Sequence, residues 1–324
     1  MSTRVSVVIP CFNAASYVGQ AIDSALAQSH GDVEVIVIDD GSTDGSSEVI
    51  ASFGARIRSE QLPHGGAPRA RNRGLALATG QAVTFLDADD LLAHDTIAAS
   101  LVALAVAPQR SVVAAPWCYL VSDGAGWRPT PHDVKPAPNG DPLAGWLVRR
   151  YQATASMLWP TTLVHELGGW DETLTKNQDG DLAMRAFVAG ARLRFSLARG
   201  PVLYRHHGAG SHSIASGTRV CDVDSCIRVI DKIAAALRAA GRFEPYRVWV
   251  ARGYHELARL YYSSQPELAR GAAAKGHELA GVRAIWGSLP HRMATLVLGL
   301  ERKEWLAATL ARCGIGDELR RLRR

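Results

Sequence analysis

Hydrophobic residues follow two alternating spacings through the first 90 residues. Val5–Pro10, Val33–Ile38 and Val83–Leu86 are short apolar runs, and each predicts a buried strand. Val18–Leu26 carries apolar residues at helical spacing, and Arg69–Thr79 is expected to form another helix. Strands that are apolar throughout and alternate with helices imply a parallel sheet covered on both faces. We therefore predict an α/β fold with a mostly parallel sheet flanked by helices.

The middle of the chain is expected to hold loops followed by a second organised block. Proline and glycine are dense between residues 108 and 142, where Val112–Ala115 fits an edge strand. Between Tyr151 and His212 we expect a glycine turn, a helix near Asp181–Ala189 and a strand near Leu193–Ser196.

Beyond Ser213 the pattern becomes that of an α-helical C-terminal extension. Apolar residues recur at helical spacing along Val220–Leu237 and Trp249–Leu260, and glycine or proline interrupts the pattern near residues 241, 266 and 290. About four or five helices are expected there. The chain is thus divided into residues 1–212 and 213–324.

The composition is that of a globular protein. Of 324 residues, 47% are hydrophobic and 21% are charged. No apolar run reaches the roughly 18 residues of a membrane span, and no secretory leader is evident. The five cysteines are scattered without the spacing of metal ligands, which is typical of reduced thiols. We therefore expect a cytoplasmic protein.

Three carboxylates follow the apolar run Val83–Leu86. If the strand continues, a period of two places Asp87 and Asp89 on the same side. Carboxylates so close together repel each other, so a cation is expected beside them. Oxygen ligands of this kind suit Mg²⁺ or Mn²⁺, which also coordinate phosphates. The alternative is an acidic turn that caps the helix carrying Ile97 and Leu101.

An acidic pair follows the predicted strand Val33–Ile38, and a basic cluster lies at the start of the predicted helix Arg69–Thr79. Asp39 and Asp40 could accept hydrogen bonds from a nucleobase or ribose. The alternative is turn chemistry, with Ser42 or Thr43 capping the next helix. Arg69, Arg71 and Arg73 lie in or near the first turn of a helix expected to begin at Pro68, where cations oppose the helix dipole but suit a bound phosphate. Of the three, Arg71 is the candidate for contact with a diphosphate or base. A solvated basic helix face is the competing interpretation.

Seven segments, in this order along the chain, resemble the motifs of family 2 glycosyltransferases, which have the A-type glycosyltransferase fold. One such motif carries little information, whereas seven in order are specific. The likeness covers about residues 4–213. The segments are Ser6–Asn13, Val37–Asp44, Ala70–Gly74, Phe85–Asp90, Gly168–Glu172, Gln178–Leu182 with Arg185, and Tyr204–His207.

The resemblance implies roles for individual residues in a nucleotide-sugar site. Asp39 and Asp40 are expected to hold the base and ribose, Asp87 to face the ribose, and Arg71 to contact the base or diphosphate. The implied nucleotide-sugar-binding set is Pro10, Phe12, Asn13, Asp39, Asp40, Arg71, Asp87 and Ala88.

The resemblance also implies a metal and a general base. Asp89 is expected to hold Mn²⁺ or Mg²⁺ on the diphosphate, with His207 as a metal ligand or hydrogen-bond donor. Asp179 aligns with the general base of inverting members. The implied reaction is metal-dependent, inverting transfer from a nucleotide-sugar, with UDP-sugar favoured, to an acceptor hydroxyl in glycan or polysaccharide assembly. Residues 1–115 would then bind the nucleotide-sugar, residues 116–212 would complete the catalytic domain with its acceptor half, and residues 213–324 would form the helical extension.

Two departures from the family pattern keep a second function open. The family often has Glu-Asp followed by an aromatic residue where this chain has Gln178, Asp179 and Gly180. The alternative is a non-catalytic scaffold or sensor that binds sugar nucleotides. Nucleotidyltransferases and NAD-dependent dehydrogenases are disfavoured because the turn after the first strand lacks their glycine-rich loop. Asp181 and Arg185 are four residues apart and are expected to form a helix ion pair.

The C-terminal end is basic and partly apolar. The net charge is +5, and Arg320–Arg324 holds four arginines, which a solvated tail explains. No nucleic-acid partner is predicted, and a homo-oligomer stays open. An apolar stripe suits either peripheral contact with the inner membrane face, where a lipid-linked acceptor would lie, or a packed subdomain or dimer interface. Packing is preferred because each stripe must be buried somewhere. The stripe is Trp286, Leu289, Met293, Leu296, Val297 and Leu300, with Arg292, Arg302 and Lys303 beside it.

Overall fold

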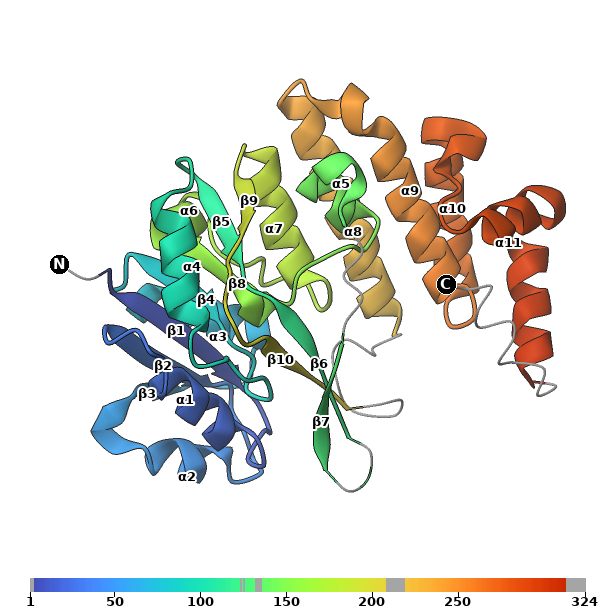
Figure 1. Cartoon of the computed structure of the whole chain (residues 1–324). Coiled ribbons are helices and arrows are strands. Elements are labelled where there is room, and N and C mark those ends of the chain that lie inside the picture. The colour runs from blue at the N-terminus through green and yellow to red at the C-terminus, as the bar shows by residue number, and fades with distance from the viewer. Residues whose placement is uncertain (1–2, 123, 125, 132–135, 208–218, 313–324) are drawn as a thin grey trace. The chain divides into compact units, whose positions relative to one another are not determined.

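The computed structural model describes residues 3–122, 124, 126–131, 136–207 and 219–312, which form two compact units (Figure 1). Unit 1 comprises Met1–Lys135, Tyr151–Thr173 and Asp181–Ser213, and unit 2 comprises Pro136–Arg150, Leu174–Gly180 and Ile214–Arg324. Unit 2 thus includes two short segments that precede the boundary expected at residue 212. That boundary, Cys313 and the Arg320–Arg324 tail lie outside the described residues.

Two sheets are found in the described part of unit 1. The larger has seven strands: β1 (Val5–Cys11), β2 (Val33–Asp39), β3 (Arg58–Gln61), β4 (Ala82–Phe85), β5 (Ser111–Ala114), β8 (Met157–Pro160) and β9 (Arg192–Phe195). Their order is β3-β2-β1-β4-β8-β5-β9, and only β8 runs antiparallel to its neighbours. The smaller sheet has the order β10-β6-β7, from β6 (Trp117–Ser122), β7 (Trp127–Thr130) and β10 (Val202–His206). The predicted mostly parallel α/β fold is confirmed.

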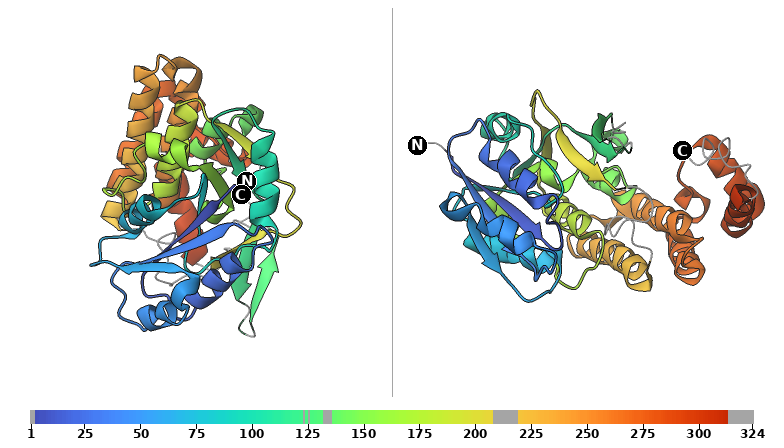
Figure 2. Two further views of the ribbon diagram at one scale, coloured as in Figure 1. Left: turned by 90° about the vertical axis from the view of Figure 1, so that its left-hand side faces the viewer. Right: turned by 90° about the horizontal axis from the view of Figure 1, so that it is seen from below.

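Helices cover both faces of the larger sheet, as Figures 1 and 2 show. One core joins inward residues of β1 to α1 and α4, and a smaller one joins β2 to α3. β1, β2 and β4 are largely buried on both faces, which explains their continuous apolar runs. The helices are α1 (Val18–Leu26), α2 (Ser46–Ala51), α3 (Ala67–Leu77), α4 (Thr96–Ala105), α6 (Thr161–Glu166) and α7 (Gln178–Val188), with short 3₁₀ turns η1 (Gly54–Arg56) and η3 (Thr154–Ser156).

The structure corrects the position of one strand. The segment expected to form an edge strand, Val112–Ala115, coincides with β5, which is paired on both sides. Strand β9 is the edge strand instead, and most of its residues are exposed. The reason is that β9, which comes later in the chain, pairs with the outer side of β5, while β8 inserts antiparallel between β4 and β5.

The expected cap of α2 is also wrong. Gly45 is the N-cap residue, with φ of 91°, and no side chain caps the helix. The side chain of Ser42 instead accepts a hydrogen bond from the Asn13 amide at 3.0 Å, and the Thr43 amide donates to Asn13 Oδ1 at 2.8 Å. Both residues thus connect the loops after β1 and β2.

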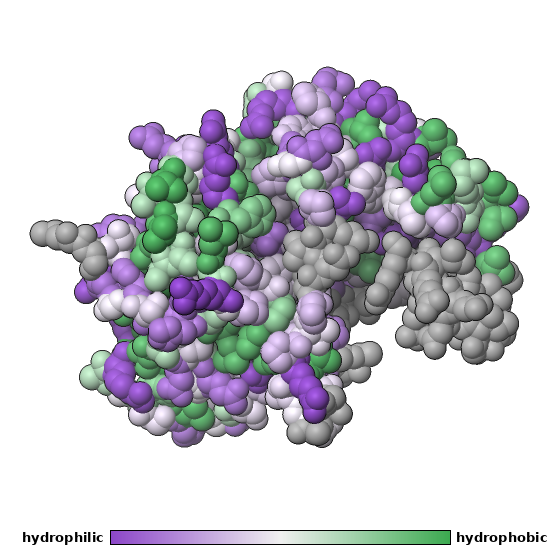
Figure 3. Space-filling view, viewed as in Figure 1, coloured by the Kyte–Doolittle hydropathy of each residue, from purple (hydrophilic) through white to green (hydrophobic). Residues whose placement is uncertain are grey.

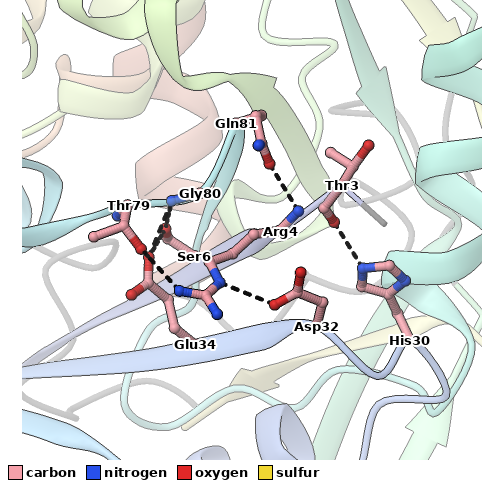
Figure 4. A network of polar contacts seen from close by, with 9 residues as sticks. All are labelled: Thr3, Arg4, Ser6, His30, Asp32, Glu34, Thr79, Gly80 and Gln81. Atoms are coloured by element: carbon pink, nitrogen blue, oxygen red, sulfur yellow. Dashed lines mark hydrogen bonds and ion pairs between the residues drawn. The ribbon is translucent and has the colours of Figure 1, made fainter. Parts of the chain in front are cut away.

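A polar network joins the amino ends of the central strands, as Figure 4 shows. Glu34 Oε1 accepts hydrogen bonds from Ser6 Oγ at 2.5 Å, from the Thr79 amide at 2.6 Å and from the Gly80 amide at 3.0 Å. Burial alone would raise the pKa of Glu34, but these hydrogen bonds outweigh it and lower the pKa. This network lies at the end of the sheet opposite to the carboxyl ends of the parallel strands, so its role is structural.

The register of the sheet brings the candidate segments together. Cys11 pairs with Asp39, and Val8 pairs with Phe85. The chain therefore leaves β1, β2 and β4 at the same edge of the sheet, where parallel α/β sheets bind their ligands.

Replacing Gly74 by alanine is expected to destabilise unit 1. A Cβ at this position of α3 would lie 2.2 Å from Cγ1 of Val8, which is buried in β1 and has little freedom to move. Overpacking of this kind costs about 1–3 kcal/mol in the free energy of unfolding. Denaturant unfolding measures the loss.

Gly271→Ala is the matched control for Gly74→Ala. A Cβ at Gly271, in α10 (Pro266–Ala280), would meet nothing within 4 Å. Alanine is the better helix former by about 1 kcal/mol, so this variant should be slightly more stable. Equal stability of the two variants would show that α3 does not need to approach β1 so closely.

Unit 2 consists of helices in its described part. They are α5 (Pro142–Leu147), α8 (Val220–Ala239), α9 (Phe243–Tyr261), α10 and α11 (Leu289–Arg312), with 3₁₀ turns η2 (Pro138–Gly140) and η5 (Gly281–Ala284). The predicted apolar stripe of α8 is confirmed at Val223, Ile227, Ile230 and Leu237, whereas Val220 is exposed. No helix among the described residues is long and apolar enough to cross a membrane.

Candidate active site

The acidic segment after β4 forms a tight turn. β4 ends at Phe85, and the Asp90 amide donates a hydrogen bond to the Asp87 carbonyl at 3.0 Å. Asp87 and Asp89 therefore lie in a turn, and the period-two argument that placed them on one side of a strand is wrong. The alternative of a helix cap is also wrong: the N-cap residue of α4 is Asp95, whose carboxylate accepts from the Arg199 amide.

Asp89 meets His207, which follows β10. His207 Nε2 lies 2.7 Å from Asp89 Oδ2. Burial and the nearby charge of Asp87 raise the pKa of Asp89, and His207 opposes that shift. The rings of Tyr17 and Trp127 lie edge-on to the imidazole, at centroid distances of 5.2 Å and 5.5 Å. Two residues far apart in the sequence thus form one polar site.

Asp90 differs from the other two carboxylates because it is fully buried. Its exposed fraction is 1%, and Oδ1 accepts a hydrogen bond from the Arg205 amide at 2.8 Å. Burial, together with the charges of Asp89 and Asp87, raises its pKa well above the ordinary value. Asp90 therefore fastens the turn to β10.

Arg205 is a residue of this site that the sequence did not single out. Its guanidinium lies between the rings of Tyr17 and Trp127, at 4.5 Å and 4.7 Å from their centroids. It also donates to Gln20 Oε1 at 3.0 Å. Arg205 was visible only as a member of the Tyr204–His207 segment. Nothing local in the sequence indicates that two aromatic rings from distant segments enclose it.

Arg71 forms an ion pair with Asp87. Neither interpretation from the sequence, contact with a base or diphosphate or a solvated basic helix face, predicted this pair. Nη2 lies 2.6 Å from Asp87 Oδ1, and the guanidinium stacks over the Trp170 ring at 4.4 Å. Arg71 is buried, so the interpretation as a solvated basic face is wrong for this residue. Arg73 pairs with Glu60 and Arg69 donates to a backbone carbonyl. Among these three arginines, Arg71 is the one paired with the acidic turn.

Asp39 and Asp40 are buried and bonded to nearby loops. Asp40 accepts from the amides of Gly65 at 2.9 Å and Gly66 at 2.7 Å, just before α3. Asp39 accepts from the Ser42 amide at 2.9 Å and from the Ser47 hydroxyl. These contacts explain why both positions are acidic, since each carboxylate satisfies buried or partly buried donors.

The loop after β1 presents an exposed aromatic ring. Phe12 has an exposed fraction of 46%, and its ring stacks on His64 with centroids 4.0 Å apart and planes 25° apart. Pro10 is buried within β1, and Asn13 has a positive φ of 48°. Ala88, in the acidic turn, is nearly buried. Phe12 is the member of the set with surface free for a planar ligand.

Asp179 is the second residue of α7 and belongs to unit 2, where it is half-buried. The two departures beside it have local explanations. Gln178 Nε2 donates to the Leu174 carbonyl at 3.1 Å. A Cβ at Gly180 would lie 2.1 Å from Asn177 Oδ1, so glycine leaves room for that side chain. Local packing therefore accounts for Gln178 and Gly180 without a loss of catalytic activity.

Asp181 and Arg185 form the expected ion pair in α7. Arg185 Nε lies 2.7 Å from Asp181 Oδ2. The same guanidinium donates to the carbonyls of Leu167 and Gly169, whose φ of 72° confirms the predicted glycine turn. This pair is structural because it joins α7 to that turn.

The donor set around Asp89 fits a metal that is completed by phosphate oxygens. One carboxylate and one imidazole converge there, a combination that Mn²⁺ accepts. No group of three or more His, Cys, Asp or Glu side chains arranged to hold a metal occurs among the described residues. A cation that takes one or two protein ligands and several phosphate oxygens needs no larger group.

Solved structures share this fold. The chain superposes on Staphylococcus aureus TarS 1-349 in complex with UDP-GlcNAc with a TM-score of 0.70, at 17% identity, covering 96% of this chain and 92% of that one. It also matches the mannosyltransferase PcManGT from Pyrobaculum calidifontis, in complex with GDP-Man and Mn²⁺. That TM-score is 0.54 at 21% identity, covering 99% and 83%. The A-type glycosyltransferase fold is thereby confirmed.

Sequence comparison identifies the family. An uncharacterized glycosyltransferase of Rickettsia bellii is 33% identical over 187 residues, which are 56% of this chain and 27% of that protein. The matches span less than two fifths of the length of the first four curated relatives. The model of glycosyl transferase family 2 matches residues 6–170, which is just over half of the chain. The chain therefore belongs to glycosyl transferase family 2.

Proposed function

We propose that the chain is a metal-dependent, inverting glycosyltransferase that moves a sugar from a nucleotide-sugar to an acceptor hydroxyl. The observation that carries the proposal is the contact between Asp89 and His207 beside the partly buried Arg71–Asp87 pair, at the edge where β1, β2 and β4 end. Acidic and basic groups meet there in the place where this fold class binds its ligands.

Each residue of the nucleotide-sugar-binding set has a proposed role in holding the donor. Phe12, stacked on His64, offers its exposed ring to the base. Asp39 and Asp40 face the base and ribose while they hold the loops around them. Asp87 is oriented toward the ribose by Arg71, which also lends positive charge to the site. Pro10, Asn13 and Ala88 shape the backbone around the nucleotide.

Two groups of residues are proposed to take part in the reaction, one at the leaving diphosphate and one at the acceptor hydroxyl. Asp89 and His207 hold Mn²⁺ or Mg²⁺, which, when bound, offsets the negative charge that grows on the departing diphosphate. Asp179 takes the proton of the acceptor hydroxyl as the sugar carbon is attacked from the opposite side. General-base assistance of this kind contributes about 10²–10⁴ in rate.

The names of the structural neighbours support a nucleotide-sugar donor. TarS is described with UDP-GlcNAc, and PcManGT with GDP-Man and Mn²⁺. We keep UDP-sugar as the favoured donor and a glycan or lipid-linked molecule as the acceptor, in polysaccharide or cell-envelope assembly. Action in the cytoplasm, either free or at the inner face of the membrane, belongs to this proposal, and a homo-oligomer is compatible with it. Residues 1–115 would bind the donor, 116–212 the acceptor, and 213–324 would form the extension.

Thermal unfolding with UDP, GDP or dTDP, each with and without Mn²⁺, tests the donor site. One nucleotide is expected to raise the melting temperature by several degrees in the presence of Mn²⁺, since a ligand at about 100 times its dissociation constant adds about 2.7 kcal/mol. If none of the three shifts the transition, the nucleotide-sugar proposal fails.

The scaffold alternative rests on Gln178 and Gly180. A scaffold would bind the nucleotide but would release no free nucleotide from UDP-sugars, with or without added acceptors. Release of UDP at a rate that depends on Mn²⁺ would exclude it. Because both departures have local packing explanations, we favour the enzyme.

A further inference from the structure

The first half of α11 exposes an apolar face. Gly299, with φ of 75°, interrupts the helix and separates Leu289–Leu298 from the rest. Leu298 is 39% exposed and lies on the other side of the helix. Four further side chains in this half are exposed by 67%, 52%, 50% and 76%: Leu289, Met293, Leu296 and Val297. Their spacing of four, three and one residues places them on one face of the helix. Figure 3 shows apolar surface over α11 beside strongly polar side chains.

The opposite face of the same segment carries two buried polar side chains. His291 and Thr295 are only 4% and 6% exposed, and Thr295 Oγ1 donates to the His291 carbonyl at 2.8 Å. The ring of His291 lies edge-on to that of buried His255 in α9, with centroids 5.5 Å apart. Burial is the main cause that lowers the pKa of His291 to about 3, so the imidazole is neutral at ordinary pH.

The apolar face therefore cannot be hidden by turning the helix over. Rotation would bring His291 and Thr295 to the surface and break the ring contact of His291 with His255 in α9. The expectation that the stripe packs within the chain is wrong for Leu289, Met293, Leu296 and Val297, and the dimer interface stays a prediction. Such a face is a candidate surface for contact with a partner outside unit 2.

The charge around this face is positive. Arg283, Arg292 and Arg302 are exposed beside or within the segment, whereas the nearby Glu301 is paired with Arg270 at 2.6 Å. Residues 289–324 contain eight arginines and lysines and four aspartates and glutamates, so they carry +4 of the net charge of +5. An apolar helix face with basic neighbours suits the headgroup region of an anionic bilayer.

We propose that the Leu289–Leu298 face of α11 binds the surface of a membrane containing anionic lipids. The four side chains enter the boundary between headgroups and acyl chains, and Arg283, Arg292 and Arg302 contact the phosphates. This inference rests on the proposed function in one respect: for a glycosyltransferase, the contact would favour an acceptor that is itself anchored in the membrane.

A second copy of the chain fits this face less well. A patch of four side chains covers at most a few hundred Å², whereas a stable interface buries about 800 Å² on each partner. A symmetric pair would also place the same arginines of both copies close to one another, where like charges repel. Charge and area thus favour the lipid surface.

Vesicle flotation of the full chain tests the proposal. Wild-type protein is expected to float with phosphatidylcholine vesicles that contain about 30% phosphatidylglycerol and much less with pure phosphatidylcholine. Raising the salt from about 50 mM to about 500 mM should weaken the binding, because the Debye length falls several-fold. Met293→Gln combined with Val297→Gln should weaken partitioning by about tenfold or more, because two apolar side chains no longer enter the bilayer.

The matched control is Val102→Gln combined with Val106→Gln. These valines are 70% and 84% exposed in and just after α4, so the same change is made on another apolar surface. The control should float like the wild type. Equal flotation of the α11 variant and the wild type would refute the proposal, as would a wild-type dimer in light scattering that becomes a monomer in that variant. The nucleotide-dependent thermal shift is measured on all variants, so loss of donor binding is seen separately from loss of membrane binding.

Discussion

Asp89→Asn is expected to abolish the Mn²⁺-dependent part of nucleotide stabilisation. Asparagine keeps the shape of the side chain but removes the charge that would bind a divalent cation beside His207. With a ligand at about 100 times its dissociation constant, the lost stabilisation is about 2.7 kcal/mol. Thermal unfolding with UDP and Mn²⁺, compared with UDP alone, measures it.

The unliganded Asp89→Asn protein should be at least as stable as the wild type. Asp87 and Asp90 are close to Asp89, and the proximity of Asp87 contributes to the raised pKa of Asp89. Removing one charge from this group relieves repulsion that only a bound cation would otherwise offset. Asp32→Asn is the control, since Asp32 pairs with Arg4 at the far end of the sheet. A metal response that survives in Asp89→Asn would remove Asp89 from the site.

Asp179→Asn is expected to lower kcat by about 10²–10⁴ while donor binding is retained. The reason is that an amide cannot accept the acceptor's proton, although it fits the same space near the start of α7. Sugar transfer or donor hydrolysis gives kcat, and the UDP- and Mn²⁺-dependent thermal shift gives donor binding. The two measurements separate a catalytic defect from an unfolded site.

Asp32→Asn again serves as the matched carboxylate-to-amide control, and its turnover should equal that of the wild type. If Asp179→Asn turns over at the wild-type rate, another group takes the proton. If it loses the nucleotide shift as well, the residue acts in donor binding or in the fold, and the assignment as general base is wrong.

The sequence by itself determined strands β1, β2 and β4, the helices α1 and α3, and the edge of the sheet that carries the site. β1, β2 and β4 were predicted as buried strands because each is a continuous apolar run, a signal contained in neighbouring residues. Their parallel arrangement followed from the alternating helices. The polar segments after these strands were then expected to meet, because parallel strands end at a common edge.

Other features needed distant segments of the chain. β8 inserts between β4 and β5 from later in the sequence, and periodicity within one segment does not record which strand pairs with which. The place of Arg205 between Tyr17 and Trp127 depends on three segments that only the fold brings together. The sequence indicated that Asp89 and His207 belong to one site, but the structure supplied their contact.

Because local sequence does not record long-range contacts, it also could not distinguish the burial and partners of neighbouring residues of the same type. The sequence grouped Asp90 with Asp87 and Asp89, although Asp90 is buried and bonded to β10. It also grouped Arg71 with Arg73, although only Arg71 reaches the acidic turn. It predicted the apolar stripe of α11 but not that its polar side faces α9. Local pattern determines which residues share a strand or a helix face, whereas the neighbours of that face depend on long-range packing, which only the tertiary structure decides.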